Sequence, residues 1–301
     1  MERCFNRPVH LIVSSPAKLN LFLAITGRRA DGFHDLVSVV APVEFGDTLS
    51  VDLRESGFSM ECDDPALEID ERNLVLRAAR AFAAETGWPG GAHFSLTKRI
   101  PMGAGLGGGS SNAASVLVVL NQLSGKALPV EDLARIAAGL GSDCPLFLHS
   151  GPVVIRGRGE HVKTLPPQAA DRLRGRRVLI FKPMFGISTA WAYRRMAEGG
   201  PVSYLPAIEA ETKLDAWIDH ATSPGESLLL NNMESPAFDK FIALPTALEC
   251  LRTEFDLSPR MSGSGSACFA FLPENAPVDV IRDRIHGLWG PQSFVAETRL
   301  S

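Results

Sequence analysis

A cluster of glycines in the middle of the chain is the first feature that could do chemistry. Residues 101–114 read PMGAGLGGGSSNAA, and five of the seven positions from 103 to 109 are glycine. Each glycine adds backbone entropy that folding must remove, so a run this dense indicates a need for closely approachable backbone amides. The run passes into residues 110–123, which are apolar on nearly every side and predict a buried helix.

The start of that helix is a candidate phosphate site. We expect Ser110, Ser111 or Asn112 to cap it, because short polar side chains accept hydrogen bonds from the first amides of a helix. The remaining amides and the helix dipole carry a partial positive charge of roughly half a unit. Such an end attracts phosphate groups, so the sequence predicts nucleotide or phosphate binding.

Two familiar glycine motifs fit this run poorly. Gly103, Gly105 and Gly108 satisfy the dinucleotide pattern G-x-G-x-x-G, and Glu131 and Asp132 lie at the distance of a ribose-binding acid. That motif closes the first strand of its domain, however, and about a hundred residues precede it here. The Walker A pattern fails because glycine replaces its lysine. A flexible turn without a ligand is the remaining alternative.

Composition places the chain among globular proteins. Its 301 residues are 45% hydrophobic and 21% charged, enough to bury one large core or two smaller ones. No apolar run reaches the roughly 18 residues of a membrane helix or forms a signal-peptide core, so we expect a cytoplasmic protein. The net charge of −4 argues against a nucleic-acid surface, and the basic residues 172–177 are expected to lie at the surface beside a loop.

The cysteines predict neither a disulfide framework nor a zinc site. They are odd in number and far apart, without a C-x-x-C pair. We expect free thiols at Cys4, Cys62, Cys144, Cys250 and Cys268.

Strands and helices interleave in the first half of the chain. Alternating apolar residues predict two strands within residues 9–25, separated by a break at 14–16. The other elements expected there are strands at 36–44, 48–53 and 93–99 and helices at 73–86, 110–123 and 130–140.

Proline and arginine accumulate in residues 164–175, which form the best candidate linker. The predicted domains are therefore 1–165 and 166–301, the second also α+β. Its expected elements are a strand at 178–182, helices at 188–196, 209–219 and 278–288, and helical pieces within 235–255.

Three polar residues stand at element boundaries. Lys18 lies at the predicted strand break, and Asn20 points to the same face of an extended segment. Asp143 lies between a helix end and the strand-like residues 146–149, a favourable place for catalysis, although a cap or a surface charge is the plainer interpretation. Gly263 and Gly265 form a small loop before an apolar strand, either a tight turn or a backbone contact to a ligand.

Three segments together resemble the signatures of the GHMP superfamily of small-molecule kinases. They are PAKLN at 16–20, PMGAGLGGGSSNAA at 101–114 and SGSGSACFAF at 262–271. The resemblance implies ATP as phosphoryl donor and a two-domain α+β fold with the active site in the cleft between the domains. It also implies a left-handed β-α-β crossover in the amino-terminal domain, which the usual handedness rule would exclude, and a ferredoxin-like carboxy-terminal domain.

The segment RRADGFH at residues 28–34 narrows the resemblance. It is similar to a member that phosphorylates the 2-hydroxyl of a cytidyl-diphosphate sugar alcohol in non-mevalonate isoprenoid biosynthesis. In that member the residues that hold the substrate match Asn20, Phe33, His34 and Tyr193. Phe33 and Tyr193 would stack on cytosine, and His34 would bond the edge of the base.

The resemblance also implies which residues act on the nucleotide. Lys18 and Asp143 match the catalytic pair, which aligns a hydroxyl and neutralises charge around the γ-phosphate. Mg²⁺ is implied with ATP, held by the serines of the second motif or by the phosphates, and no residue is assigned as a dedicated metal ligand. The implied ATP-binding residues are Asn73, Lys98, Pro101, Met102, Gly103, Ala104, Gly105, Leu106, Gly107, Gly108, Gly109, Ser110 and Ser111. Among them, Lys98 and Met102 would border the adenine, with Asn73 nearby.

Two positions depart from that member. Phe33 stands where many relatives have tyrosine, and Val40 stands where some have an aromatic ring, so a wall of the cytosine pocket can differ. Another kinase of the superfamily, of homoserine or mevalonate type, and a non-catalytic ATP-binding relative are the alternatives. The expected partner is a small molecule, without nucleic acid or membrane, and the expected state is a monomer or weak homodimer.

Overall fold

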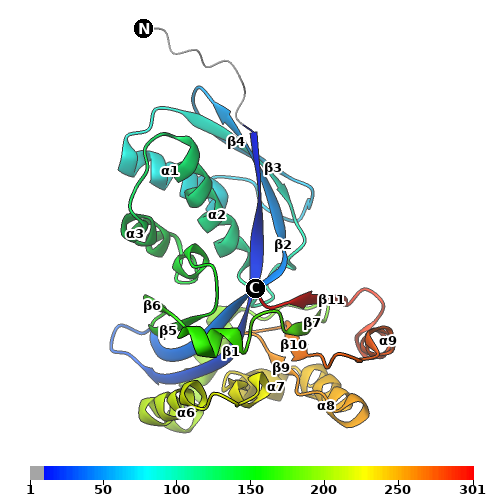
Figure 1. The fold of residues 1–301 in the computed structure, drawn as a ribbon. Helices are drawn as coiled ribbons and strands as arrows, with labels where there is room; N and C mark the ends of the chain where they lie inside the picture. Colours follow the sequence, from blue (N-terminus) through cyan, green and yellow to red (C-terminus); the bar gives the residue numbers. More distant parts are fainter. Residues whose placement is uncertain (1–9) are drawn as a thin grey trace. The chain divides into compact units, whose positions relative to one another are not determined.

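The computed structural model describes residues 10–301, which form two compact units (Figure 1). Two long strands, β1 (His10–Arg28) and β2 (His34–Arg54), supply residues to both units. The two units are each built from several separate segments of the chain. The single domain boundary expected after residue 165 stays a prediction. The first unit comprises residues up to 17, 46–100 and 107–149, and the second comprises 18–45, 101–106 and 150–301.

The first unit places a sheet against helices. Its strands β3 (Phe58–Cys62) and β4 (Gly91–Thr97) pair in parallel, and β4 pairs antiparallel with residues 48–54 of β2. Figure 1 shows α1, α2 and α3 on one side of these strands. The core between them contains Phe82, Phe94 and Leu117, all fully buried. The helices are α1 (Leu74–Thr86), α2 (Gly108–Leu123) and α3 (Val130–Leu140).

The break predicted at residues 14–16 is wrong, because β1 runs straight through them. A Cβ atom on Gly46 of β2 would lie only 2.4 Å from the carbonyl oxygen of Ser15. Glycine lets the two backbones pass at this point, so both strands continue. The strands predicted at 36–44 and 48–53 are likewise one strand, β2.

Two further predictions about the first unit are wrong. The strand-like residues 146–149 fall largely in a 3₁₀ helix, η1 (Pro145–Leu148), because proline fixes the φ angle of a first helical residue. No serine or asparagine caps α2, which begins at Gly108 with Gly107 as its N-cap.

The second unit contains two groups of strands. Strand β5 (Val153–Gly157) pairs with residues 36–40 of β2 and with β6 (His161–Thr164), while the short β8 (Leu230–Asn231) runs parallel to β1. A separate antiparallel sheet has the order β11-β7-β10-β9. Its strands are β7 (Arg177–Lys182), β9 (Arg260–Met261), β10 (Cys268–Phe271) and β11 (Phe294–Arg299).

The helices predicted for this unit are confirmed to within a few residues. They are α5 (Thr189–Glu198), α6 (Ala207–Asp219), α7 (Glu234–Lys240), α8 (Ala243–Phe255) and α9 (Val278–Trp289), with short 3₁₀ turns η2 (Pro201–Ser203) and η3 (Gly225–Leu228). The proposed linker contains the helix α4 (Pro167–Asp171), and Leu165 and Leu173 on either side of it are buried in the unit.

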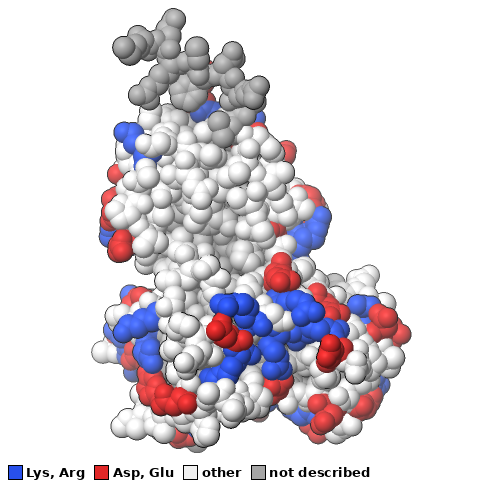
Figure 2. Space-filling view, in the orientation of Figure 1, with Lys and Arg blue, Asp and Glu red and all other residues white. Residues whose placement is uncertain are grey.

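The basic residues 172–177 are engaged in contacts within this unit. Arg174 pairs with Asp171 at 2.6 Å, Arg176 pairs with Glu226, and Arg177 pairs with Glu297 at 2.8 Å. The Arg172 guanidinium lies 4.0 Å from the centre of the Trp217 ring and donates to the Trp217 carbonyl. Figure 2 shows acidic side chains interspersed among the lysines and arginines of the visible face.

No helix within residues 10–301 is long and apolar enough to cross a membrane. The thiols of Cys62, Cys144, Cys250 and Cys268 are free, as predicted, and Cys4 lies outside the described residues.

Candidate active site

The glycine run has a backbone that only glycine adopts readily. Gly103, Gly105 and Gly107 have φ angles of +60°, +76° and +73°, in the region that strains other residues. Gly105 is required for a second reason, because a Cβ atom there would lie 2.3 Å from the carbonyl oxygen of Ser262. The intervening Ala104 and Leu106 are buried and anchor the loop.

The amino-terminal end of α2 carries the features of an anion site. The N-cap residue, Gly107, has no side chain to bond the first amides of the helix. The Ser111 hydroxyl is fully buried and has no hydrogen-bond partner among the described residues. An orphaned buried hydroxyl beside open helix amides fits a ligand with phosphate oxygens.

The turn that contains Asp143 lies beside this helix end. A Cβ atom on Gly141 would lie 3.4 Å from the Cys144 sulfur and 3.9 Å from the Ser110 hydroxyl, which places this turn beside the first turn of α2. Burial raises the pKa of the Cys144 thiol, so the sulfur stays protonated and neutral. The turn that contains the half-buried Asp143 thus lies beside Ser110 of α2.

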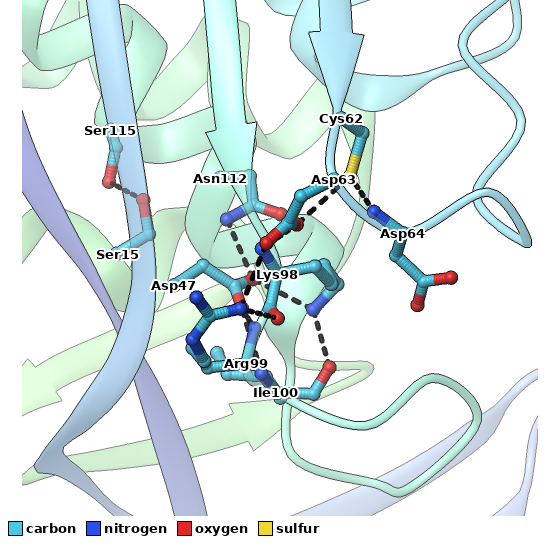
Figure 3. A network of polar contacts seen from close by, with 10 residues as sticks. All are labelled: Ser15, Asp47, Cys62, Asp63, Asp64, Lys98, Arg99, Ile100, Asn112 and Ser115. Atoms are coloured by element: carbon cyan, nitrogen blue, oxygen red, sulfur yellow. Dashed lines mark hydrogen bonds and ion pairs between the residues drawn. The ribbon is translucent and has the colours of Figure 1, made fainter.

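A buried acid holds the chain just before the glycine run (Figure 3). The Asp47 carboxylate is fully buried and accepts bonds from the Lys98 ammonium at 2.8 Å and the Asn112 side chain at 3.0 Å. It also accepts the backbone amides of Arg99 at 2.7 Å and Ile100 at 2.8 Å. Asp47 therefore links the end of β4 to α2.

Lys98 and Asn73, expected near the adenine, have structural partners. The Lys98 ammonium bonds Asp47 and, at 2.5 Å, the Ile100 carbonyl, and it lies 3.2 Å from the position of a Cβ on Gly108. Asn73 is the N-cap of α1, where its side chain accepts the Val75 amide at 3.0 Å. Their contact with adenine stays a prediction.

In the second unit, Lys18 is a buried residue and not a surface lysine. Its side chain is 4% exposed, and its ammonium donates to Asn20 Oδ1 at 2.5 Å. Asn20 Nδ2 donates in turn to the Ser38 hydroxyl at 3.0 Å. The predicted shared face of Lys18 and Asn20 is confirmed, and the contact fixes where the ammonium lies.

The loop of the third signature segment, residues 262–271, packs against Lys18, Asn20 and the glycine run. Gly263 has a φ of +59°, and a Cβ atom there would lie 3.1 Å from Asn20 Oδ1 and 3.5 Å from Lys18 Nζ. The Ala267 amide donates to the Ala104 carbonyl at 3.1 Å. The loop is a tight turn that brings motif three to Lys18 and to residues 104–106.

The predicted substrate residues His34 and Tyr193 meet in the second unit. Their ring centroids are 4.9 Å apart, and His34 is only 9% exposed. Burial lowers the pKa of His34 below its ordinary value of 6.5, and the positive charge of Arg28 lowers it further. Phe33 is 56% exposed, with the Arg158 guanidinium 4.7 Å from its ring centre.

These residues fall into two sets. The first unit contains Asn73, Lys98, Asp143 and residues 107–111. The second unit contains Lys18, Asn20, Phe33, His34, Tyr193 and residues 101–106. The pairing of Lys18 with Asp143 stays a prediction. Within residues 10–301 no group of three or more His, Cys, Asp or Glu residues could hold a metal ion.

Comparison with known proteins decides the family. The GHMP kinases N terminal domain family matches residues 73–151, which include Asp143 and residues 101–114. A 4-diphosphocytidyl-2-C-methyl-D-erythritol kinase from Synechococcus sp. (strain CC9605) is 36% identical over 285 residues, covering 91% of this chain and 92% of the relative. The chain belongs to the 4-diphosphocytidyl-2-C-methyl-D-erythritol kinase family.

Other members of the 4-diphosphocytidyl-2-C-methyl-D-erythritol kinase family agree. That of Methylacidiphilum infernorum (isolate V4) is 36% identical over 268 residues, 87% of this chain and 86% of the relative. A crystal structure of 4-(cytidine 5'-diphospho)-2C-methyl-D-erythritol kinase has a TM-score of 0.76 and 33% identity, covering 97% of this chain and all of the other. Mevalonate kinase from Methanococcus jannaschii, at 14% identity and a TM-score of 0.71, covers 98% of this chain and shares the fold.

The predicted GHMP fold of α+β class is thereby confirmed. Kinases of this superfamily take the phosphoryl group from ATP and transfer it to a small molecule. The hand of the crossover and the ferredoxin-like form of the second domain stay predictions.

Sequence reasoning missed Asp47 and Tyr204. Period-two alternation places residue 47 on the buried face of β2 with Leu49 and Val51, and a carboxylate among buried positions was a usable signal. Tyr204 Oη lies 3.2 Å from His34 Nε2, across 170 positions of sequence, and nothing in the local pattern indicates this contact.

Proposed function

We propose that this chain transfers the γ-phosphoryl group of ATP to the 2-hydroxyl of 4-diphosphocytidyl-2-C-methyl-D-erythritol, giving ADP and the 2-phosphate. The main support for a phosphate site is the amino-terminal end of α2, which has no side-chain cap and has the unpaired Ser111 hydroxyl beside it. Relatives 36% identical over about nine-tenths of the chain support the choice of substrate.

The chain's own residues supply positioning and charge. Residues 103–111 hold the triphosphate through backbone amides, and Lys18, kept in place by Asn20, neutralises charge that develops around the γ-phosphate. Asp143 orients the attacking hydroxyl and accepts its proton. Mg²⁺, held by Ser110 or Ser111 together with the phosphates, would supply further neutralisation, and the free Ser111 hydroxyl fits such a role.

The base of the substrate is recognised in the second unit. Phe33 and Tyr193 offer rings to stack on cytosine, and neutral His34 offers a hydrogen bond to its edge. His34→Ala should weaken binding of the cytidyl substrate by roughly 1–3 kcal/mol and leave ATP affinity nearly unchanged. We further propose a cytoplasmic monomer or weak homodimer, without a nucleic-acid or membrane partner.

An ADP-release assay tests the activity. Purified protein with ATP and Mg²⁺ receives the cytidyl-diphosphate sugar alcohol, mevalonate or homoserine in separate reactions. We expect turnover with the cytidyl substrate alone. Preferred turnover of mevalonate or homoserine would replace this proposal by the corresponding kinase, and ATP binding without turnover of any acceptor would favour the non-catalytic alternative.

A further inference from the structure

His34 meets a second aromatic residue that the proposed mechanism does not use. Tyr204 Oη lies 3.2 Å from His34 Nε2, and the two ring centroids are 5.9 Å apart. Among the described residues, His34 Nδ1 has no hydrogen bond. One ring nitrogen of His34 is therefore engaged by the protein, and the other remains for a ligand.

The backbone on either side of Tyr204 is hydrogen-bonded to other segments of the second unit. The Leu205 amide donates to the Ile25 carbonyl at 3.1 Å. Asn232 Nδ2 donates to the Ser203 carbonyl at 3.2 Å and to the Ile25 carbonyl at 2.9 Å. The residues on both sides of Tyr204 are thus tied to the end of β1.

We propose that Tyr204 is a positioning residue that fixes the ring orientation and tautomer of His34, and so makes the site selective for cytosine over uracil. The inference rests on the proposed reading of the base by His34. Tyr204 touches His34 and acts on the substrate through it.

The chemistry of the imidazole explains the selectivity. A neutral histidine has one donor nitrogen and one acceptor nitrogen. If the Tyr204 hydroxyl donates to Nε2, then Nδ1 carries the proton and donates, and if Nε2 donates to the hydroxyl, Nδ1 accepts. Cytosine presents an acceptor at N3 and a donor at its amino group, whereas uracil presents a donor at N3 and an acceptor at O4. With the Tyr204 hydroxyl donating to Nε2, an Nδ1–H placed opposite position 3 of the base pairs with the N3 acceptor of cytosine. The same Nδ1–H faces the N3–H donor of uracil and leaves both groups unpaired.

Two measurements on Tyr204→Phe test the proposal, because phenylalanine keeps the ring and removes only the hydroxyl. The first is the ¹⁵N spectrum of the histidine side chains, with the His34 signals assigned by their loss in His34→Gln. We expect one tautomer for His34 in the wild type and a mixture in Tyr204→Phe. The second is the ratio of kcat/KM for the cytidyl substrate to that for its uridyl analogue, which should fall about tenfold while the KM for ATP stays within about twofold.

A double variant supplies the control. In His34→Gln, adding Tyr204→Phe should change the base ratio little, because the hydroxyl has lost the ring that it positions. An unchanged His34 spectrum in Tyr204→Phe would overturn the positioning role. A mixed tautomer with an unchanged base ratio would overturn the reading of the base by His34, and with it that part of the proposed function.

Discussion

Lys98 Nζ lies 2.8 Å from Asp47 Oδ2, and the two side chains are 6% and 0% exposed. The carboxylate also receives Asn112 and two backbone amides, so its charge is well compensated. Removing one partner of such a buried pair leaves the other charged and unpaired, which costs far more than losing a surface ion pair.

Asp47→Asn should therefore lower the free energy of unfolding by about 3–5 kcal/mol, because Lys98 stays buried without a counter-charge. Urea denaturation measures the loss. Asp279→Asn is the matched control, since that aspartate is 90% exposed and should change stability little. Equal stability of the two variants would mean that the network does not hold the first unit together.

Asp143→Asn should reduce kcat by about 10²–10⁴-fold and leave ATP affinity nearly unchanged, because the amide cannot accept the proton of the attacking hydroxyl. Steady-state kinetics and calorimetry with an ATP analogue measure the two effects. Asp132→Asn, an exposed carboxylate on α3 in the same unit, should behave as the wild type. A wild-type kcat for Asp143→Asn would remove this residue from the mechanism.

Lys18→Met should lower kcat/KM at least on the order of a hundredfold, because the buried ammonium no longer neutralises the transferred phosphoryl group. Lys163→Met, an exposed lysine of β6, controls for the loss of a positive charge. Full activity of Lys18→Met would leave Lys18 a purely structural residue, bonded to Asn20.

Gly107→Val should abolish measurable nucleotide affinity, since a β-branched residue is strained at φ +73° and would move the first turn of α2. Gly125→Val is the matched control, because Gly125 has a φ of +68° in a loop away from the phosphate site. Calorimetry with a non-hydrolysable ATP analogue compares them. Affinity lost equally in both variants would point to general strain instead of a phosphate cradle.

Acidification should destabilise the protein in part through His34. Its folded-state pKa lies below the usual 6.5, so the unfolded chain binds the proton first. The stability contributed by neutral His34 is present above about pH 6.5 and is lost as the pH falls from there to the folded-state pKa. Between about pH 7.5 and about pH 5.5, His34→Gln should therefore lose less free energy of unfolding than the wild type. His149, whose pKa burial also lowers, gives the parallel variant His149→Gln. If His34→Gln lost as much free energy of unfolding as the wild type, the acid sensitivity would come from other groups.

Elements with local signals were predictable from the sequence. The helix at 130–140 has the predicted bounds, because its apolar period and the acids of its first turn lie within one segment. The density of glycines in residues 103–109 likewise indicated an unusual backbone, and three of these glycines have positive φ angles. The break in β1 was predicted wrongly because the close approach that removes it depends on Gly46, a residue of another strand.

Contacts between distant residues could not be predicted in this way. Asp47 meets Lys98 and Asn112 across 51 and 65 positions, and burial of an acid is decided by the packing of β2 against α2. The N-cap of α2 was also predicted wrongly, because Gly107, with a φ of +73°, lets the helix begin before the serines are reached.

The engaged arginines of residues 172–177 affect how a protease would attack the chain. Trypsin cleaves after arginine in extended, accessible backbone, yet Arg172 and Arg177 donate to carbonyl groups of distant segments and Leu173 between them is buried. These bonds must open before a protease can take the segment into its cleft. Arg172 and Arg177 are thus shielded from tryptic digestion while the second unit is folded, and cleavage after either of them reports its unfolding.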